Sequence, residues 1–128
     1  MESETAEIDV AAPADRVWAL VSDFGGLDQW MPGLESCTLD GDVRTIEMMG
    51  LEIKEQLVNR DDESRSIAYS IIEGPVPVDS HKATITVTPK GDEASHITWR
   101  VDVEPEGAAM FKDIYQGALG AVKAQLEG

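Results

Sequence analysis

The sequence is poor in cysteine, histidine and basic side chains. Its 128 residues include one cysteine, Cys37, which excludes an intrachain disulfide and any metal site built from several cysteines, and which suits a reducing compartment. Ten Lys and Arg stand against 25 Asp and Glu, for a formal net charge of −15. This balance argues against a nucleic-acid-binding protein and against stable attachment to anionic membranes, because both need cationic side chains.

Long apolar runs and linkers are also absent. The longest apolar run is Val17–Val21, far shorter than a membrane span, and Met1–Glu4 lacks the basic segment of a secretory leader. No repeat or Gly/Ser-rich linker divides the chain, and a hydrophobic content of 42% suits a folded protein. We therefore expect one cytoplasmic domain over residues 1–128, as a monomer or homodimer.

Hydrophobic periodicity predicts an α+β fold. A strand over 5–12 ends at Pro13, which suits the first position of a helix over 13–23, and a second short helix over 27–31 follows. Period-two alternation, punctuated by turn residues, then predicts an antiparallel meander. With the first strand it makes seven strands, the other six lying near 34–39, 43–49, 52–59, 65–73, 81–88 and 95–103.

One face of this meander is apolar, with Glu55 and His81 as two exceptions. Helical spacing returns over 108–126, where a broad apolar stripe needs a large surface to cover it. The apolar face of the sheet is the candidate, so we expect a curved seven-stranded antiparallel sheet wrapped around one long C-terminal helix. The stripe comprises Phe111, Ile114, Tyr115, Ala118, Leu119, Val122 and Leu126.

This order of elements resembles the helix-grip fold of the START-like (SRPBCC-type) superfamily, which includes the pollen allergens and the polyketide cyclase/dehydrase family. The more specific segments are Pro13–Trp18, Trp30–Pro32, Val43–Ile46 and Tyr69–Pro75. The resemblance implies a deep cavity between sheet and helix that holds a hydrophobic or amphipathic small molecule.

The middle of the chain also resembles the plant abscisic-acid receptors. Residue by residue, that likeness implies a gate at Gly50 and Leu51, an inward acid at Glu55, a cavity wall at Tyr69 and Ile71, and a polar position at His81. The loop over 73–79, stiffened by two prolines, resembles a lid. The basic latch residue of the receptors is replaced within Val76–Val78, so hormone sensing does not transfer.

The candidate site combines ionisable and aromatic side chains. Extending the inward register places Arg44 between Glu35 and Glu55, either to orient a ligand or only to balance charge and fix register. His81 is a proton donor or acceptor in the cavity, or a satisfied core histidine. Trp30 and Trp99 are stacking walls or ordinary core. Further lining is expected from Met48, Leu51, Tyr69, Ile71, Phe111, Tyr115 and Leu119, with Met31, Met49 and Met110 as adaptable neighbours.

The leading functional prediction is binding or carriage of a lipid, polyketide or aromatic metabolite, without a metal or another cofactor. His81 and His96 fit no compact metal motif. The alternative is a cyclase or dehydratase in which Glu55 or His81 moves a proton while Tyr69 or Arg44 polarises a carbonyl. A stress or chaperone-like interaction protein is the third possibility, and a collapsed cavity would favour it.

Overall fold

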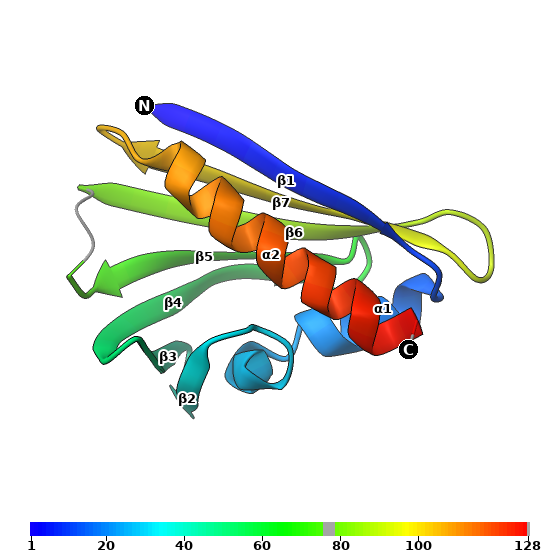
Figure 1. Ribbon diagram of the computed structural model, residues 1–128, viewed down its shortest axis with the longest axis horizontal. Coiled ribbons are helices and arrows are strands. Elements are labelled where there is room, and N and C mark those ends of the chain that lie inside the picture. Colours follow the sequence, from blue (N-terminus) through cyan, green and yellow to red (C-terminus); the bar gives the residue numbers. More distant parts are fainter. Residues whose placement is uncertain (76–78, 128) are drawn as a thin grey trace.

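A computed structural model describes residues 1–75 and 79–127 of the chain. Seven antiparallel strands form one sheet in the order β1-β7-β6-β5-β4-β3-β2, so the chain meanders from β2 to β7 and β1 closes the far edge (Figure 1). The expected strand number and direction are confirmed. The strands are β1 Glu2–Val10, β2 Leu34–Asp40, β3 Val43–Met48, β4 Leu51–Asp61, β5 Ser66–Glu73, β6 Ser80–Pro89 and β7 Ser95–Glu104.

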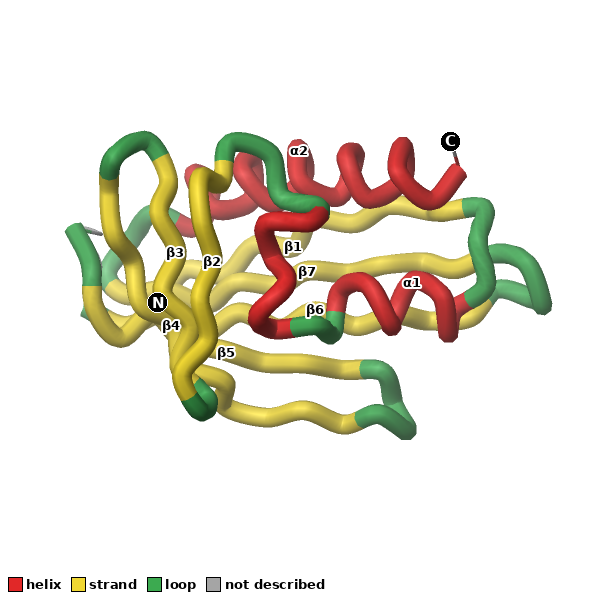
Figure 2. Tube along the Cα trace, turned by 90° about the horizontal axis from the view of Figure 1, so that it is seen from below, coloured by secondary structure: helices red, strands yellow, loops and turns green. Residues whose placement is uncertain are grey.

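Three helices accompany the sheet. They are α1 (Ala14–Val21), the 3-10 helix η1 (Phe24–Gln29) and α2 (Ala108–Glu127). Helix α2 crosses one face of the sheet diagonally in Figure 1, and η1 runs beside the edge strand β2 in Figure 2. Gln116 and Lys123 of α2 donate hydrogen bonds to the carbonyl oxygens of Glu7 and Asp9, at 2.9 and 3.0 Å. These bonds fasten α2 to the backbone of the edge strand β1.

The structure moves several of the predicted boundaries, and two of them are displaced most. Strand β1 starts at Glu2 rather than near residue 5, because its polar first residues pair along β7, from Glu2 opposite Val103 onward. The second short helix starts at Phe24, but Gly26 within it has non-helical φ and ψ of −106° and 22°, so the predicted break is present as a kink inside η1. In both places pairing or packing with distant residues overrides the local signal.

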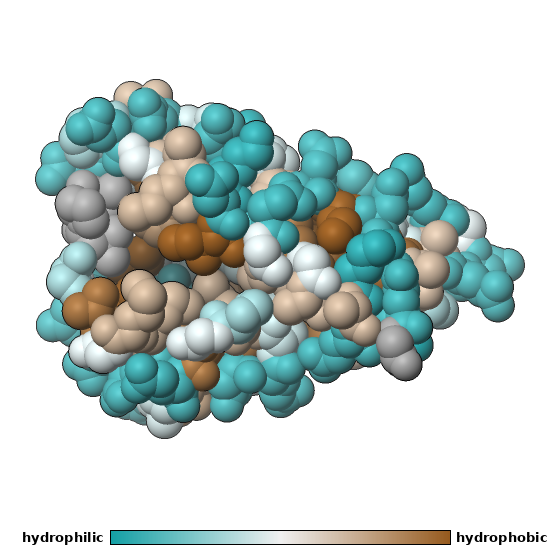
Figure 3. Space-filling view, viewed as in Figure 1, coloured by the Kyte–Doolittle hydropathy of each residue, from teal (hydrophilic) through white to brown (hydrophobic). Residues whose placement is uncertain are grey.

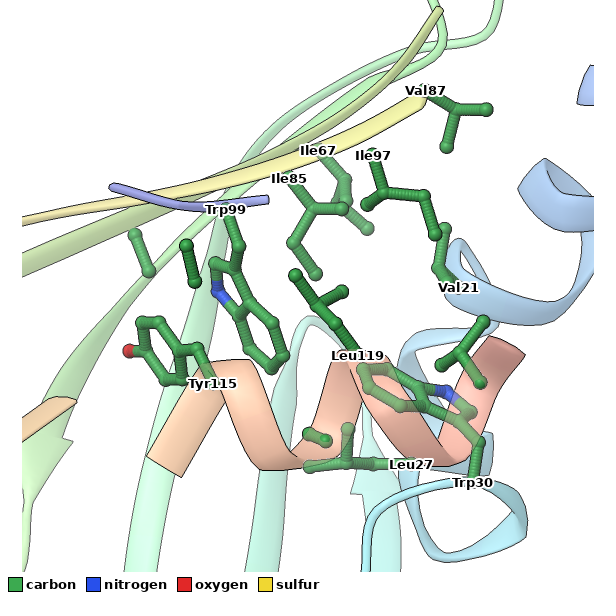
Figure 4. Close-up of a cluster of buried hydrophobic side chains, with 14 of the residues drawn as sticks. Val21, Leu27, Trp30, Ile67, Ile85, Val87, Ile97, Trp99, Tyr115 and Leu119 are labelled. Atoms are coloured by element: carbon green, nitrogen blue, oxygen red, sulfur yellow. The ribbon is translucent and has the colours of Figure 1, made fainter. Parts of the chain in front are cut away.

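The predicted apolar face is confirmed by burial. The inward residues of β6 and β7, from His81 to Val87 and from Ile97 to Val103, are at most 5% exposed. Figure 4 shows this closed core between the sheet, α2 and the short helices, with Leu119 of α2 near Ile85 and Trp30. The stripe of α2 differs from the prediction at Ile114, which is 41% exposed because the sheet curves away from that half of the helix.

Three bulges distort the sheet where the strands bend. The pairing register skips Glu35 on β2, Val58 on β4 and Ile72 on β5, and all three side chains are exposed. Bulges increase local twist and bend a strand. A further irregularity separates β5 from β6, whose pairing stops at Tyr69 opposite Ala83 although both strands continue.

Candidate ligand-binding cavity

An apolar cavity of about 230 Å³ opens between the N-terminal half of α2 and strands β3 to β5. Figure 3 shows apolar side chains gathered around a hollow near one end of the molecule. Four of the lining side chains carry polar groups, and the other twelve residues are apolar. The lining comprises Leu27, Met31, Arg44, Ile46, Met48, Met49, Leu51, Ile53, Glu55, Tyr69, Ile71, Pro75, Met110, Phe111, Ile114 and Tyr115.

A buried ion pair occupies the polar end of the cavity. Arg44 and Glu55 are opposite each other on β3 and β4, and each is at most 6% exposed. The Arg44 Nε and Nη2 atoms both approach Glu55 Oε1, at 2.8 and 2.7 Å, and Nη1 donates to the carbonyl oxygen of Phe24 at 3.1 Å. Burial raises the pKa of Glu55, while the Arg44 guanidinium opposes that rise.

Two aromatic rings pack against the guanidinium. The Arg44 Cζ atom lies 4.0 Å from the ring centre of Phe24 and 4.7 Å from that of Tyr69. A planar guanidinium is attracted to the faces of aromatic rings, more strongly where water is excluded. Arg44 is thus held by a carboxylate, a carbonyl and two rings, and these contacts fix its position in the cavity.

Two tyrosines from different elements meet at the same end. Tyr69 on β5 accepts a hydrogen bond from Trp99 Nε1 at 3.2 Å, and Tyr115 on α2 stacks on the Trp99 ring with centres 3.9 Å apart and an interplanar angle of 1° (Figure 4). Burial raises the pKa of both phenols above its ordinary value. Both side chains are therefore neutral near pH 7 and offer hydroxyl groups.

His81 lies behind the cavity wall. Its Nδ1 atom is 3.2 Å from the backbone nitrogen of Ile71, and its Nε2 atom is 3.1 Å from the Tyr115 hydroxyl. The first bond occupies the place where β5 and β6 no longer pair. Burial lowers the pKa of His81 to about 4, so the imidazole is neutral near pH 7.

The structure brings most of the predicted site residues to one cavity and moves others away from it. Trp99 lies behind Tyr115, while Trp30 and Leu119 belong to the closed core, where the Trp30 ring is tilted by 59° against that of Trp99. His81 lies outside the cavity lining and contacts it through hydrogen bonds with Tyr115 and Ile71 and through its packing against the rings of Phe111 and Tyr69. Apart from Glu35, the remaining predicted residues line the cavity: Arg44, Met48, Leu51, Glu55, Tyr69, Ile71, Phe111 and Tyr115.

The expected position of Glu35 beside Arg44 is wrong. Straight alternation from Cys37 would turn Glu35 inward, but the bulge in β2 shifts the register so that Leu34 pairs with Met48. Glu35 is exposed, and among the described residues Arg44 has one acidic partner, Glu55. A single bulge residue thus turns the Glu35 carboxylate to solvent and leaves Leu34 packed against the core.

Sequence reasoning missed the contribution of η1. Leu27 lines the cavity, and Phe24 supplies both the carbonyl and one ring that hold Arg44. The apolar residues three positions apart in an otherwise polar, glycine-containing segment are the signal that could have found them.

The predicted lid lies partly outside the described residues, which exclude 76–78. Pro75 at its start lines the cavity. A separate crevice of about 130 Å³ lies between the ends of β5 and β6, lined by Glu73, Asp79, Ser80 and His81 among others. Within residues 1–75 and 79–127, no group of three His, Cys, Asp or Glu side chains is arranged to hold a metal. In the same part of the chain no helix has the length and hydropathy to cross a membrane.

Comparison with known proteins shows which protein family this chain belongs to. The chain belongs to the family described as polyketide cyclase / dehydrase and lipid transport, whose model matches residues 1–127. No curated protein sequence matches the chain. The family and fold expected from the resemblance are thus confirmed.

Solved structures support the same fold. An uncharacterized protein from Bacillus thuringiensis has 26% identity and a TM-score of 0.92, over 99% of this chain and 100% of that chain. A START superfamily protein from Mycobacterium smegmatis has 19% identity and a TM-score of 0.76, over 98% and 97%. Norcoclaurine synthase from Thalictrum flavum, solved with dopamine and hydroxybenzaldehyde, has 24% identity and a TM-score of 0.73, over 98% and 85%.

Proposed function

We propose that this protein binds or carries a small hydrophobic molecule in the cavity beside α2. The observation that carries the proposal is the cavity itself, with twelve apolar residues in its lining and its polar side chains gathered around Arg44 and Glu55. Burial of apolar ligand surface drives binding at such a site, while a few placed polar groups orient the ligand.

The cavity volume favours a ring-sized ligand over a long acyl chain. An apolar cavity of about 150 Å³ is enough to hold benzene, whereas the volume of this cavity is about 230 Å³. One or two fused rings fit that space. Norcoclaurine synthase, which shares the fold, holds dopamine and hydroxybenzaldehyde, so the fold accommodates small aromatic molecules.

Filling the cavity tests this function. Ile53 is half-buried in the cavity wall, while Val58 on the same strand is exposed at a bulge. We expect Ile53→Trp to abolish binding of naphthalene, followed by chemical-shift titration, and Val58→Trp to leave it unchanged. Native mass spectrometry of protein from its own source should show a co-purifying small molecule. Failure of wild type to bind any apolar ring compound would overturn the proposal.

A cyclase or dehydratase activity is the second candidate. The observation that favours it is the meeting of a buried carboxylate, Glu55, with the Tyr69 hydroxyl in one cavity, where a proton acceptor and a carbonyl-polarising donor could face one substrate. Both nitrogens of His81 are engaged, so Glu55 is the better candidate for the base. Turnover lost in Glu55→Gln while substrate binding persists would support this activity, and product formation at the wild-type rate would contradict it.

The third prediction, an interaction protein, depended on a collapsed cavity, and the open volume speaks against it. Cytoplasmic location, a single domain and a monomeric or homodimeric state stay predictions. Size-exclusion chromatography with light scattering measures the oligomeric state directly.

A further inference from the structure

The donor and the acceptor can be assigned in each hydrogen bond of His81. A backbone N–H can only donate, so the bond from Ile71 N to His81 Nδ1 makes that ring nitrogen the acceptor. The proton of the neutral imidazole then lies on Nε2, which must donate to the Tyr115 oxygen 3.1 Å away. The pKa of about 4 for His81 keeps this arrangement in place near neutral pH.

A second obligatory donor acts on Tyr69. The indole N–H of Trp99 has no acceptor function, so it donates to the Tyr69 oxygen at 3.2 Å. The oxygen of each tyrosine therefore already accepts one hydrogen bond, and each hydroxyl still has its own proton to donate. Of the two tyrosines, Tyr69 is the one beside the ion pair, with its ring centre 4.7 Å from the Arg44 Cζ atom.

The hydroxyl proton of Tyr69 has no acceptor among the described residues. No hydrogen bond among the described residues is donated by its hydroxyl, and its side chain lines the cavity. The Tyr69 hydroxyl, beside Arg44 and Glu55, therefore has a proton that is available to a ligand.

Besides the donor on Tyr69, the cavity has a free hydrogen-bond acceptor on Glu55. Both contacts from Arg44 to Glu55 reach Oε1, and no hydrogen bond among the described residues reaches Oε2. The guanidinium has its other bond on Phe24 and balances the carboxylate in charge. A ligand carboxylate would therefore meet Glu55 without an unpaired cation to offset it, and burying such an anion is costly.

We propose that the cavity selects an uncharged ring compound carrying a hydroxyl or an equivalent donor–acceptor group, which accepts the Tyr69 proton and donates to Glu55. This inference rests on the proposed function and narrows its ligand class. It excludes fatty acids and other carboxylates as preferred ligands. His81 is a positioning residue in this arrangement, because its hydrogen bonds are to Tyr115 and Ile71 of the cavity wall and not to the ligand.

Four naphthalene probes test the selectivity by chemical-shift titration. We expect 2-naphthol to bind tightest, followed by 2-methoxynaphthalene, which can only accept, and then by naphthalene, each step about five- to tenfold. The anion 2-naphthoate should bind weakest to wild type. In Glu55→Gln it should gain affinity, because Arg44 then lacks its counter-charge. Tightest binding of 2-naphthoate by wild type would overturn the inference.

Two matched variants test whether Tyr69 is the tyrosine whose hydroxyl donates to the ligand. Tyr69→Phe and Tyr115→Phe each remove one buried hydroxyl from the cavity. We expect Tyr69→Phe to reduce the preference for 2-methoxynaphthalene over naphthalene to about one, and Tyr115→Phe to retain it. The opposite result, or equal loss in both, would overturn the assignment to Tyr69. If naphthalene itself fails to bind wild type, the proposed function fails; if all four probes bind equally, only this inference fails.

Discussion

The two halves of α2 carry the same kind of apolar stripe but meet different surroundings. Ala118, Leu119 and Val122 in the C-terminal half are at most 1% exposed and close the core against the sheet and the short helices. Phe111, Ile114 and Tyr115 in the N-terminal half line the cavity. The difference shows that an amphipathic pattern predicts which face turns inward, but not whether that face is packed or left open.

The largest expected contrast comes from placing a charge in each half. Ala118→Glu buries an unpaired carboxylate in the closed core and should cost about 5 kcal/mol of unfolding free energy or more. Ile114→Glu places the same group at the exposed cavity mouth and should cost about 1 kcal/mol or less. Denaturant unfolding measures both. Equal losses of unfolding free energy would mean that the two halves of α2 are packed alike.

Removing one partner of the ion pair tests whether the cavity half depends on charge balance. Arg44→Met leaves Glu55 buried without its counter-charge, so we expect a loss of about 3–5 kcal/mol. The double variant Arg44→Met/Glu55→Leu should recover most of that loss, since no charge is then buried. Lys90→Met, which breaks the exposed pair with Asp9, is the control and should cost about 1 kcal/mol at most. A double variant as unstable as the single one would contradict this account.

Acid should weaken the cavity half through His81. As the pH falls from about 6.5 to about 4, the unfolded chain protonates this histidine while the folded protein keeps it neutral. The unfolded state therefore binds more protons, and stability falls with pH in that window before the contribution levels off below pH 4. The pKa difference corresponds to about 3 kcal/mol.

The measurement is the difference in unfolding free energy between wild type and His81→Phe across pH 4 to 7. His81→Phe should lose this part of the acid dependence, and His96→Gln, at a half-buried position on the opposite face of the sheet, should retain it. Identical pH profiles for wild type and His81→Phe would show that His81 is accessible to protons in the folded state.

Changing two exposed glycines of α2 to alanine should have the smallest effect on stability. Gly117 lies at the junction of the halves of α2 and Gly120 in the closed half, and an added Cβ meets open space at both. Each change to Ala should stabilise by about 0.5–1 kcal/mol. Gly50→Ala is the control of opposite sign, because φ there is +76°. Unequal gains at Gly117 and Gly120 would mean that the halves also differ on their outer face.

The sequence predicts the inward faces of β4 to β7 well, because alternation is a local property of a strand. It therefore also identifies Glu55 and His81 as buried ionisable residues, which burial confirms. It fails at Glu35 because a bulge is decided by how two strands and a neighbouring helix fit together. It also fails at Phe24, whose carbonyl and ring become important only when Arg44 arrives from a different element.

The order of elements, the apolar face of the sheet and the stripe of α2 follow from the sequence alone, because each depends on the spacing of apolar residues along one segment. The open volume beside Tyr69 and the direction of the hydrogen bonds that reach it were decided only by the tertiary structure. Both depend on where β5 and β6 separate and on how the sheet curves away from one half of α2. No single segment encodes that gap, since it results from the packing of several.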